Sequence, residues 1–365
     1  MSSADVVDTA EEAAAETHPP LIIRRPLEAF LDGHGLGEGE IQAARIGDGH
    51  SNLNFLITRG TDRYVLRRPP RPPRPPSAHD VLREARVLRA IENTPARVPR
   101  VLVTSEDGEH GEGILGVPFY LMPYIEGEVI TSELPAPLDT PRERESIARE
   151  LIDALAEVHA LDPFERGLEG FGKPTGYLER QLRRFTGLWE HNQTREVPEI
   201  EQTTEWLHRN LPESPPATIV HGDFRLGNAM YAPEAPARLV ALFDWELSTI
   251  GDPLADVGYL TATYAQVDDP ENLFTQTLSQ VTARDGFPSR DELVAQYEER
   301  TGRSMSDLRW YQALALWKSA VFLEGNYKRF VQGASDDEFY RLMEHGIPEL
   351  ARAALEVTKQ PAPGT

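Results

Sequence analysis

The stretch 221–228, with the sequence HGDFRLGN, constrains the fold of this chain more than any other feature. It follows a short apolar run of strand type at 218–220 and fits the spacing H-x-D-x-x-x-x-N. In that pattern the aspartate accepts the proton of an attacking hydroxyl, and the asparagine five positions later binds Mg²⁺. Asp223 is therefore the predicted catalytic base and Asn228 a predicted metal ligand. The alternative is that both are turn residues of a surface hairpin.

A second apolar run, 239–243, points to the same chemistry. It ends in Asp244, sixteen residues after Asn228, where a short hairpin would return the chain. Carboxylate and amide oxygens at the ends of adjacent strands can share a hard cation that bridges nucleotide phosphates. Asp244 is the second predicted Mg²⁺ ligand, and its presence weakens the surface-hairpin alternative.

Short runs of strand type also occupy the first part of the chain and indicate an antiparallel meander. They span 43–46, 53–57 and 64–67. Gly47, Gly49, Ser51 and Asn52 lie between the first two runs. Because glycines and exposed backbone N–H groups allow a polyphosphate to approach closely, these residues are predicted to bind a nucleotide. Asn52 replaces the last glycine of G-x-G-x-x-G, and an ordinary hairpin turn explains the segment equally well.

A phosphate-binding cation is expected on the strand that follows this loop. Lysine cannot supply it, because no lysine precedes Lys173. The alternation of side chains in a strand places Val65 and Arg67 on one face and Arg68 on the other. Arg67 is therefore the predicted cation. Glu84, on the following predicted helix, is its predicted partner, although a solvated surface carboxylate is an equal alternative for that residue.

The order of these runs predicts two lobes of different composition. Residues 1–18 are rich in Ala, Glu, Ser and Thr without apolar periodicity, which predicts a disordered tail. Residues 19–123 carry the strand-type runs, and residues 124–365 are mostly helical in pattern. We therefore expect an α+β protein with a small antiparallel β-sheet N-lobe, which binds the nucleotide, and a larger helical C-lobe with the catalytic loop and the acceptor site.

Apolar residues at helical spacing predict a helix over 78–92, with Ser77 as its N-cap. The proline-rich segment 67–76 before it cannot form a helix or a central strand, because proline lacks the N–H donor. A stiff connector is the preferred interpretation of this segment, and a ligand for a partner domain is the other. The further predicted helices span 142–161, 177–192, 201–211, 290–301, 308–330 and 336–357.

Composition excludes several classes of function. The 365-residue chain has no cysteine, which excludes disulfide scaffolds, zinc ribbons and cysteine nucleophiles and makes a reducing cytoplasm the expected location. A formal charge of −22 argues against binding to nucleic acid or to an anionic membrane. No apolar stretch reaches the roughly 18 residues of a membrane span. The opening residues lack the basic and apolar regions of a signal peptide.

One phosphate-loop motif is a chance match. Residues 167–173 fit G-x-x-x-x-G-K, but Pro174 stands where a Ser or Thr must bind Mg²⁺, and no predicted strand precedes the segment. The sequence also contains no H-E-x-x-H and no G-x-S-x-G motif. Zinc peptidase and serine esterase functions therefore lose their usual support.

Taken together, HGDFRLGN at 221–228 and FDWELSTIGDPLAD at 243–256 resemble the aminoglycoside phosphotransferase and choline kinase superfamily of small-molecule kinases. The chain is most similar to the kinase-like domain that is fused to certain acyl-CoA dehydrogenases, and the resemblance extends from about Arg45 to the C-terminus. It includes VLRRPP at 65–70, REARVLRAI at 83–91 and FYLMPYIEG at 119–127. The resemblance implies a bilobal, protein-kinase-like fold and phosphoryl transfer from ATP, or GTP, with Mg²⁺.

The resemblance also implies roles for individual residues. Met122 and Tyr124 resemble the hinge that hydrogen-bonds adenine, and the nucleotide is expected in the cleft between the lobes. His221 is expected to brace the catalytic loop, and Asp252 and Asp256 are expected to cap and brace it rather than to do chemistry.

The spacing after the catalytic loop separates this chain from protein kinases. Only six residues lie between Asp244 and Gly251, and no A-P-E sequence follows. No long activation loop exists to hold a peptide substrate. The acceptor is therefore expected to be a small molecule that carries a hydroxyl group and is held by the helical lobe. The sequence leaves the oligomeric state open.

Two acceptors of opposite charge are considered. A cationic amino sugar needs carboxylates, which the net charge of −22 supplies easily, whereas an anionic hydroxyacyl thioester of coenzyme A needs clustered cations. The candidate cations are Arg180, Arg183 and Arg184 on one predicted helix, and Lys318, Lys328 and Arg329 on another. Solvated helix faces are the other explanation of both clusters. The arginine-rich helices and the closer resemblance favour the acyl acceptor over the antibiotic. A nucleotide-binding scaffold without catalysis is the remaining alternative.

Overall fold

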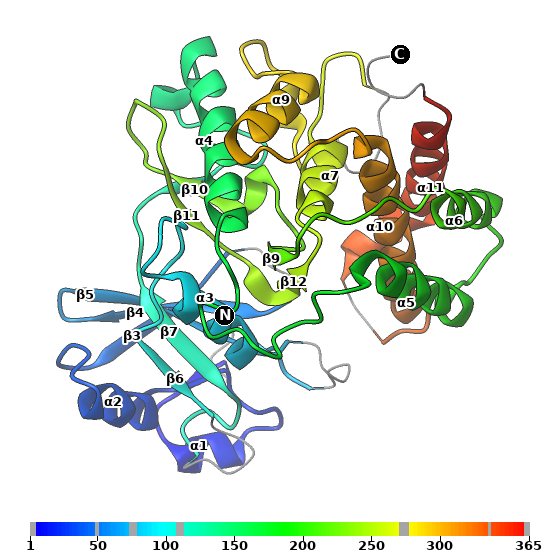
Figure 1. Ribbon diagram of the computed structural model, residues 1–365. Helices are drawn as coiled ribbons and strands as arrows, with labels where there is room; N and C mark the ends of the chain where they lie inside the picture. The colour runs from blue at the N-terminus through cyan, green and yellow to red at the C-terminus, as the bar shows by residue number, and fades with distance from the viewer. Residues whose placement is uncertain are drawn as a thin grey trace. The chain divides into compact units, whose positions relative to one another are not determined.

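The computed structural model describes residues 5–47, 51–72, 79–106, 113–269, 277–334 and 337–360. The chain divides into two compact units, Met1–Glu126 and Gly127–Thr365, and each is described by itself (Figure 1). The division falls close to the predicted lobe boundary after residue 123. An antiparallel sheet dominates unit 1 and helices dominate unit 2, which confirms the predicted α+β fold class.

Unit 1 is built on a five-stranded sheet with the strand order β3-β4-β5-β7-β6. The strands span Ile41–Ile46 (β3), Leu53–Arg59 (β4), Asp62–Arg68 (β5), Val103–Ser105 (β6) and Phe119–Pro123 (β7). All neighbouring pairs are antiparallel, so β3, β4 and β5 form the predicted meander. Alternate residues of β4, namely Leu53, Phe55 and Ile57, lie in the apolar core on one face of this sheet.

The predicted disordered tail over 1–18 is wrong for the residues that the structure describes. They form β1 (Val6–Val7) and α1 (Ala10–Ala15), which are followed by β2 (Ile22–Ile23) and α2 (Arg24–Gly33). Strand β1 pairs in parallel with β2, and Val7 is buried in the core of unit 1. Thr9 and Glu12 form a capping box at the start of α1. Packing against the rest of the unit thus orders a segment that shows little apolar periodicity.

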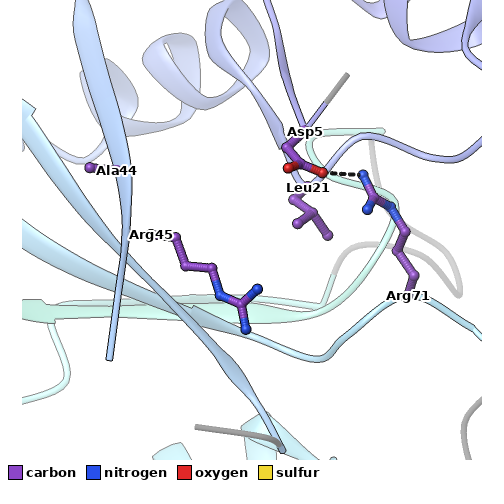
Figure 2. A pocket seen from close by; sticks show the side chains of 5 residues that line it. All are labelled: Asp5, Leu21, Ala44, Arg45 and Arg71. Atoms are coloured by element: carbon purple, nitrogen blue, oxygen red, sulfur yellow. Dashed lines mark hydrogen bonds and ion pairs between the residues drawn. The ribbon is translucent and has the colours of Figure 1, made fainter. Parts of the chain in front are cut away.

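Figure 2 shows the place where this N-terminal segment meets the sheet. The guanidinium of Arg71 donates to the carboxylate of Asp5 at 2.9 Å and to the carbonyl oxygen of Pro19 at 2.6 Å. The pocket at this place has a volume of about 460 Å³ and is lined by Asp5, Leu21, Ala44, Arg45 and Arg71. None of the predicted site residues lines it, so it is distinct from the predicted nucleotide site.

Helix α3 spans Val81–Ile91, inside the predicted range. Its N-cap is Asp80 and not the predicted Ser77, because the Asp80 carboxylate accepts the N–H of Arg83 at 2.9 Å. Ser77 and the proline-rich residues 73–78 lie outside the described residues. The helix therefore begins one turn later than its sequence suggests.

Unit 2 holds its strands in two small sheets. The first pairs β9 (Thr218–Val220) with β12 (Thr249–Gly251), and the second has the order β11-β10-β8, with β11 at Leu239–Leu242, β10 at Ala229–Tyr231 and β8 at Glu128–Val129. All of these pairs are antiparallel. Strand β9 leads into the stretch 221–228 and β10 leaves it. The predicted catalytic loop therefore lies between two strands of different sheets.

The helices of unit 2 match the predicted ranges with small shifts at their ends, except that the last one begins at Met343 and not at 336, because a 3-10 helix spans Glu338–Leu342. They are α4 (Pro141–His159), α5 (Tyr177–Asn192), α6 (Pro198–Arg209), α7 (Leu254–Thr263), α9 (Arg290–Thr301), α10 (Leu308–Val331) and α11 (Met343–Lys359). Helix α10 contacts α5, α6, α7 and α11, so it is the central helix of this unit (Figure 1). Helix α7 was not predicted. Among the described residues, no helix has the length and apolar character needed to cross a membrane.

Candidate functional site

Asp223 and Asn228 contact each other directly in unit 2. The side-chain amide of Asn228 donates to the Oδ2 carboxylate oxygen and to the main-chain oxygen of Asp223, each at 2.8 Å. These two bonds use the nitrogen of the amide, so its oxygen, Oδ1, is turned away from Asp223. The loop thus presents a carboxylate and an amide oxygen, which are the two groups that the motif predicts.

Two further side chains contact the Asp223 carboxylate and were not predicted. Nε of Arg225 lies 3.5 Å from Oδ1 of Asp223, and the hydroxyl of Tyr259, from α7, hydrogen-bonds to the same carboxylate. Burial, together with the negative charge of Asp223, raises the pKa of Tyr259 well above its usual value, so Tyr259 remains a proton donor. Tyr259 had no signal in the sequence because α7 itself was not predicted.

A buried carboxylate braces the main chain of the loop. Asp256 accepts the N–H of His221 at 2.7 Å and the N–H of Gly222 at 2.8 Å, and Nε2 of His159 lies 3.2 Å from it. Burial opposes ionisation of Asp256, but the contact with His159, the charge of His221 and the N–H of Gly222 outweigh it and lower the pKa of this carboxyl. Asp256 therefore has the bracing role that was predicted for it.

Asp252 and His221 also form hydrogen bonds that hold the fold around the loop. Asp252 accepts the N–H of Leu254 at 2.9 Å and the hydroxyl of Tyr311 at 2.8 Å, at the start of α7. Burial raises the pKa of the Asp252 carboxyl. Nε2 of His221 lies 2.9 Å from the carbonyl oxygen of Phe243, at the end of β11. His221 therefore ties the catalytic loop to the second strand of the motif.

Glycine is required at the second position of the motif. Gly222 has φ of +88°, and a Cβ atom there would lie 2.7 Å from the carbonyl oxygen of Leu247. Any side chain would meet this main-chain atom as well as the strain of a positive φ. The loop can pass close to Leu247 only because position 222 has no side chain.

Asp244 follows β11 in the left-handed backbone region, with φ of +64°. In the described part of the chain, His79 is the only other non-glycine residue with a positive φ. The N–H of Phe243 donates to the carbonyl oxygen of Asn228 at 2.9 Å, so Asn228 and Asp244 lie at the same end of the β10–β11 hairpin. Strained residues of this kind are concentrated at functional sites, which supports a functional role for the Asp244 carboxylate.

In unit 1 the predicted pair of Arg67 and Glu84 is present. Nε of Arg67 donates to the Glu84 carboxylate at 2.7 Å, and the two side chains are 9% and 1% exposed. The alternative of a solvated surface carboxylate is therefore wrong for Glu84. A longer contact of 3.4 Å joins Arg67 to the side-chain oxygen of Asn54. Arg68 donates to the carbonyl oxygens of Pro69 and Leu21 and so points away from Glu84, as predicted.

The predicted phosphate loop connects β3 and β4. Gly47 has φ of +72°, Oγ of Ser51 lies 3.1 Å from Nδ1 of His79, and Asn52 is buried at 2% exposure. Gly49 lies outside the described residues. Because β3 and β4 are antiparallel neighbours, the geometry fits both a hairpin connection and a phosphate-binding loop.

The predicted hinge continues strand β7. Met122 is a buried residue of this strand. The N–H of Tyr124 donates to the carbonyl oxygen of Arg63 at 3.1 Å, and the Arg63 guanidinium lies over the Tyr124 ring at 4.4 Å. The main chain of Tyr124 is thus committed to the sheet. In an extended chain the neighbouring groups, the carbonyl of Pro123 and the N–H of Ile125, point to the opposite side.

Comparison with known proteins assigns the chain to one family. The model of the phosphotransferase enzyme family matches residues 42–311, a range that includes the Arg67–Glu84 pair and the catalytic loop. The chain belongs to this phosphotransferase family. The family and the fold support small-molecule kinase activity.

Curated relatives share the sequence over most of this chain. Acyl-CoA dehydrogenase family member 11 of Rattus norvegicus is 31% identical over 345 residues, which cover 92% of this chain and 43% of the rat protein. Acyl-CoA dehydrogenase family member 10 of Mus musculus is 33% identical over 316 residues, which cover 86% of this chain and 29% of the mouse protein. The chain thus spans less than half the length of these relatives, and the predicted resemblance is confirmed.

Solved structures of phosphotransferases share the fold. The crystal structure of a candidate aminoglycoside phosphotransferase from Ralstonia eutropha is 30% identical, with a TM-score of 0.77, and the match covers 92% of this chain and 97% of that chain. A thermostable mutant of aminoglycoside phosphotransferase APH(4)-Ia, solved with AMP-PNP and hygromycin B, matches with a TM-score of 0.57 at 17% identity over 93% of this chain and 100% of that chain. These matches confirm the predicted fold class.

The oxygen atoms at the predicted catalytic loop have the chemistry that Mg²⁺ requires. This ion prefers oxygen ligands and is usually held by one or two protein groups together with water and substrate phosphates. Asn228 Oδ1 and the Asp244 carboxylate are oxygen groups of this kind at the same end of the β10–β11 hairpin. Across the described ranges, no three or more His, Asp or Glu side chains are grouped to hold a metal ion.

Proposed function

We propose that the chain transfers the γ-phosphoryl group of ATP to a hydroxyl group of a small molecule, with Mg²⁺ as cofactor. Asp223 accepts the proton of the hydroxyl as its oxygen attacks the γ-phosphorus, and the bond from that phosphorus to the bridging oxygen of ADP breaks. The observation that carries this proposal is the contact of Asp223 with Asn228 in a loop braced by Asp256.

The carboxylate of Asp223 is held in place from two sides. Asn228 contacts Oδ2, whereas Arg225 is nearest to Oδ1. Tyr259 adds a hydrogen bond to the same group. These contacts fix the plane of the carboxylate, which a general base needs in order to meet the proton of a bound hydroxyl. Asn228 and Asp244 would hold Mg²⁺, which neutralises charge on the nucleotide phosphates when bound.

Residues of unit 1 are proposed to bind the nucleotide. Arg67 contacts its phosphates, and Glu84 holds the guanidinium in the required orientation. The proposed phosphate loop consists of Gly47, Gly49, Ser51 and Asn52. Beside Met122 and Tyr124, the carbonyl of Pro123 and the N–H of Ile125 supply the hydrogen bonds to adenine, because the N–H of Tyr124 is already used within the sheet.

The proposed acceptor is a hydroxyl group on an acyl thioester of coenzyme A. The support is that the relatives sharing this domain are named as members of acyl-CoA dehydrogenase families. An amino sugar is the other candidate, since a structural neighbour was solved with hygromycin B. That neighbour is only 17% identical and shares the fold alone.

A mass-spectrometric acceptor screen tests the proposal, with ATP and GTP offered in parallel. We expect Mg²⁺-dependent transfer to a hydroxyacyl-coenzyme A and not to an aminoglycoside. Asp223→Asn should reduce turnover by roughly 10²–10⁴-fold and leave nucleotide affinity nearly unchanged, because the carboxylate acts on the hydroxyl. Lys173→Met, at an exposed position, is the matched control and should keep full activity.

Three outcomes would contradict parts of the proposal. Near-native turnover of the Asp223→Asn variant would show that Asp223 is not the base. Transfer to an aminoglycoside alone would replace the acceptor class. Nucleotide binding without transfer to any member of the panel would favour a scaffold that lacks catalysis.

A further inference from the structure

The cations of unit 2 that were considered for an anionic acceptor differ in their contacts. Arg180, on α5, donates to the main-chain oxygens of Lys173 and Thr175. Lys328, on α10, donates to the main-chain oxygen of His191 at 2.6 Å. Both side chains therefore serve the local structure of unit 2.

Arg184 and Lys318 are arranged differently. The ammonium of Lys318 lies 4.9 Å from the centre of the Phe185 ring, and the guanidinium of Arg184 lies 5.9 Å from the same ring. Within the part of the chain that the structure describes, neither cation forms an ion pair with a carboxylate. In a chain with 59 acidic and 37 basic residues, two neighbouring cations without a carboxylate are unexpected.

Two other polar atoms on α5 and α10 also lack a partner in the described part of the chain. Thr186 Oγ1, on α5, and Trp317 Nε1, on α10, are buried and have no hydrogen-bond partner among the described residues. The Phe185 and Trp317 rings lie 6.2 Å apart, so the Trp317 indole belongs to the contact between α5 and α10 that includes Phe185. The indole N–H and the two cations are donors only. A ligand with acceptor atoms suits this set.

If Lys318 had only a structural role, its burial would raise the free energy of the folded state without compensation. Burial lowers its pKa from 10.5 to about 8; the charge of Arg184 acts in the same direction, and the charge of Asp256 opposes it. A partly buried ammonium beside a second cation is unfavourable unless an anion is bound nearby. Asp256, whose charge acts on Lys318, also braces the catalytic loop.

We propose that Arg184 and Lys318, referred to below as the α5–α10 cation pair, bind a phosphate or carboxylate group of the acceptor molecule. This inference rests on the proposed function and adds an anionic group to the description of its acceptor. The aromatic ring of Phe185, which both cations approach, would keep them side by side before the ligand binds.

Matched acceptor probes test the pair in the full chain. Glycerophosphate is compared with glycerol for a phosphate group, and β-hydroxybutyrate with its amide for a carboxylate. Lys318→Met and Arg184→Gln should each raise the KM of one anionic probe by about 10- to 100-fold, since each removes a charge-assisted hydrogen bond. The KM values of the uncharged probe and of ATP should not change. The probe that responds identifies the anionic group.

Two control variants separate this effect from a general loss of charge. Arg183→Gln removes the neighbouring exposed arginine of α5, and Lys328→Met removes a lysine of α10 that has its own main-chain partner. Both should leave the KM of every probe unchanged. Arg184 is exposed, so Arg184→Gln still reports on the pair if Lys318→Met proves hard to fold. Equal changes with charged and uncharged probes, or equal effects of the controls, would overturn the proposal.

Calorimetric titration keeps this test independent of the proposed reaction. If no probe is phosphorylated but an anionic probe binds the wild type and both substitutions weaken its binding, the cation pair stands and the proposed function fails. If neither anionic probe binds the wild type, the proposed pair is wrong. If transfer occurs and anionic and uncharged probes respond alike to the substitutions, the proposed function stands and the pair is again wrong.

Discussion

Two groups of basic residues, one in each unit, show opposite solutions to the burial of positive charge. In unit 1, Arg67 is buried and held by the Glu84 carboxylate at 2.7 Å. In unit 2, Lys318 is partly buried beside Arg184 and an aromatic ring, and among the described residues it forms no ion pair with a carboxylate. A paired cation keeps a fixed geometry at all times. An unpaired one raises the free energy of the fold until an anion binds.

The two arrangements suit two different tasks. A paired cation is held in one orientation, whereas an unpaired cation can select its ligand. A guanidinium that must meet the phosphates of every nucleotide in the same way benefits from a permanent partner, because the partner removes rotamer freedom. A cation that must distinguish one acceptor from another benefits from having no partner, since its discrimination then depends on the ligand.

The largest effect is expected from breaking the pair in unit 1. Glu84→Gln leaves Arg67 as a buried charge without a carboxylate, and removal of one partner of a buried ion pair typically costs about 3–5 kcal/mol. The free energy of unfolding in urea should fall by an amount of this order. Nucleotide affinity, measured by calorimetry, should also fall because the guanidinium loses its orientation.

The double substitution Arg67→Met with Glu84→Met sharpens this test. Replacement of a whole buried ion pair by apolar side chains is often neutral or stabilising. The double variant should therefore recover most of the lost stability but not the nucleotide affinity. Recovery of both would show that the pair has no role in nucleotide binding.

A smaller effect is expected at the paired carboxylate of unit 2. Asp256→Asn replaces an anion that accepts two main-chain N–H groups, and a hydrogen bond to a charged group contributes about 1.5–3 kcal/mol. Thermal unfolding should show a loss of this order together with a large loss of turnover. Asp153→Asn, which removes a partly exposed ion pair with Arg300, is the control and should cost about 1 kcal/mol or less.

The dependence of this contribution on pH has a defined sign. Because the pKa of Asp256 is lowered in the fold from its ordinary 3.8, its stabilising contribution is complete above that value and is lost as the pH falls below it. Burial also lowers the pKa of His159 from 6.5, so the unfolded chain takes up a proton first and stability already begins to fall below pH 6.5. The Asp256→Asn variant should lose the acid-dependent step near pH 3.8 and keep the one near 6.5.

The sequence predicted the positions of those candidate site residues that depend on local spacing. Asp223, Asn228 and Asp244 lie at strand ends whose positions follow from short apolar runs, and the alternation of side chains in one strand separated Arg67 from Arg68. These features need only the period of a strand and the length of a turn. They can therefore be predicted without knowledge of tertiary packing.

The parts that the sequence could not supply depend on packing between distant segments. Tyr259 reaches Asp223 from a helix with no clear amphipathic pattern, and Val7 is ordered only because it packs in the core of unit 1. The N–H of Tyr124 is committed to Arg63 by strand pairing that extends beyond the predicted run. Likewise, six basic residues on two helices look equivalent in sequence, and only their contacts separate Arg184 and Lys318 from the rest.

The smallest expected effect is the change in the free energy of unfolding when the unpaired cation Lys318 is removed. Lys318 has its pKa lowered from 10.5 to about 8 by burial, with Arg184 adding to the effect and Asp256 opposing it. Its protonated form is therefore less stable in the fold than in the unfolded chain. Lys318→Met should raise the free energy of unfolding at pH 7 by on the order of 1–3 kcal/mol after allowance for solvent screening.

This gain should depend on pH in one direction only. Below pH 8 the cost of the charged lysine is complete, so the gain of the Lys318→Met variant over the wild type is constant. Between about 8 and 10.5 the folded wild type gives up the proton before the unfolded chain does, so wild-type stability rises and the gain shrinks to zero. Urea unfolding at pH 7, 9 and 10.5 measures the change. A variant less stable than the wild type at pH 7 would mean that Lys318 already has a stabilising partner, and the contrast between the two units would fail.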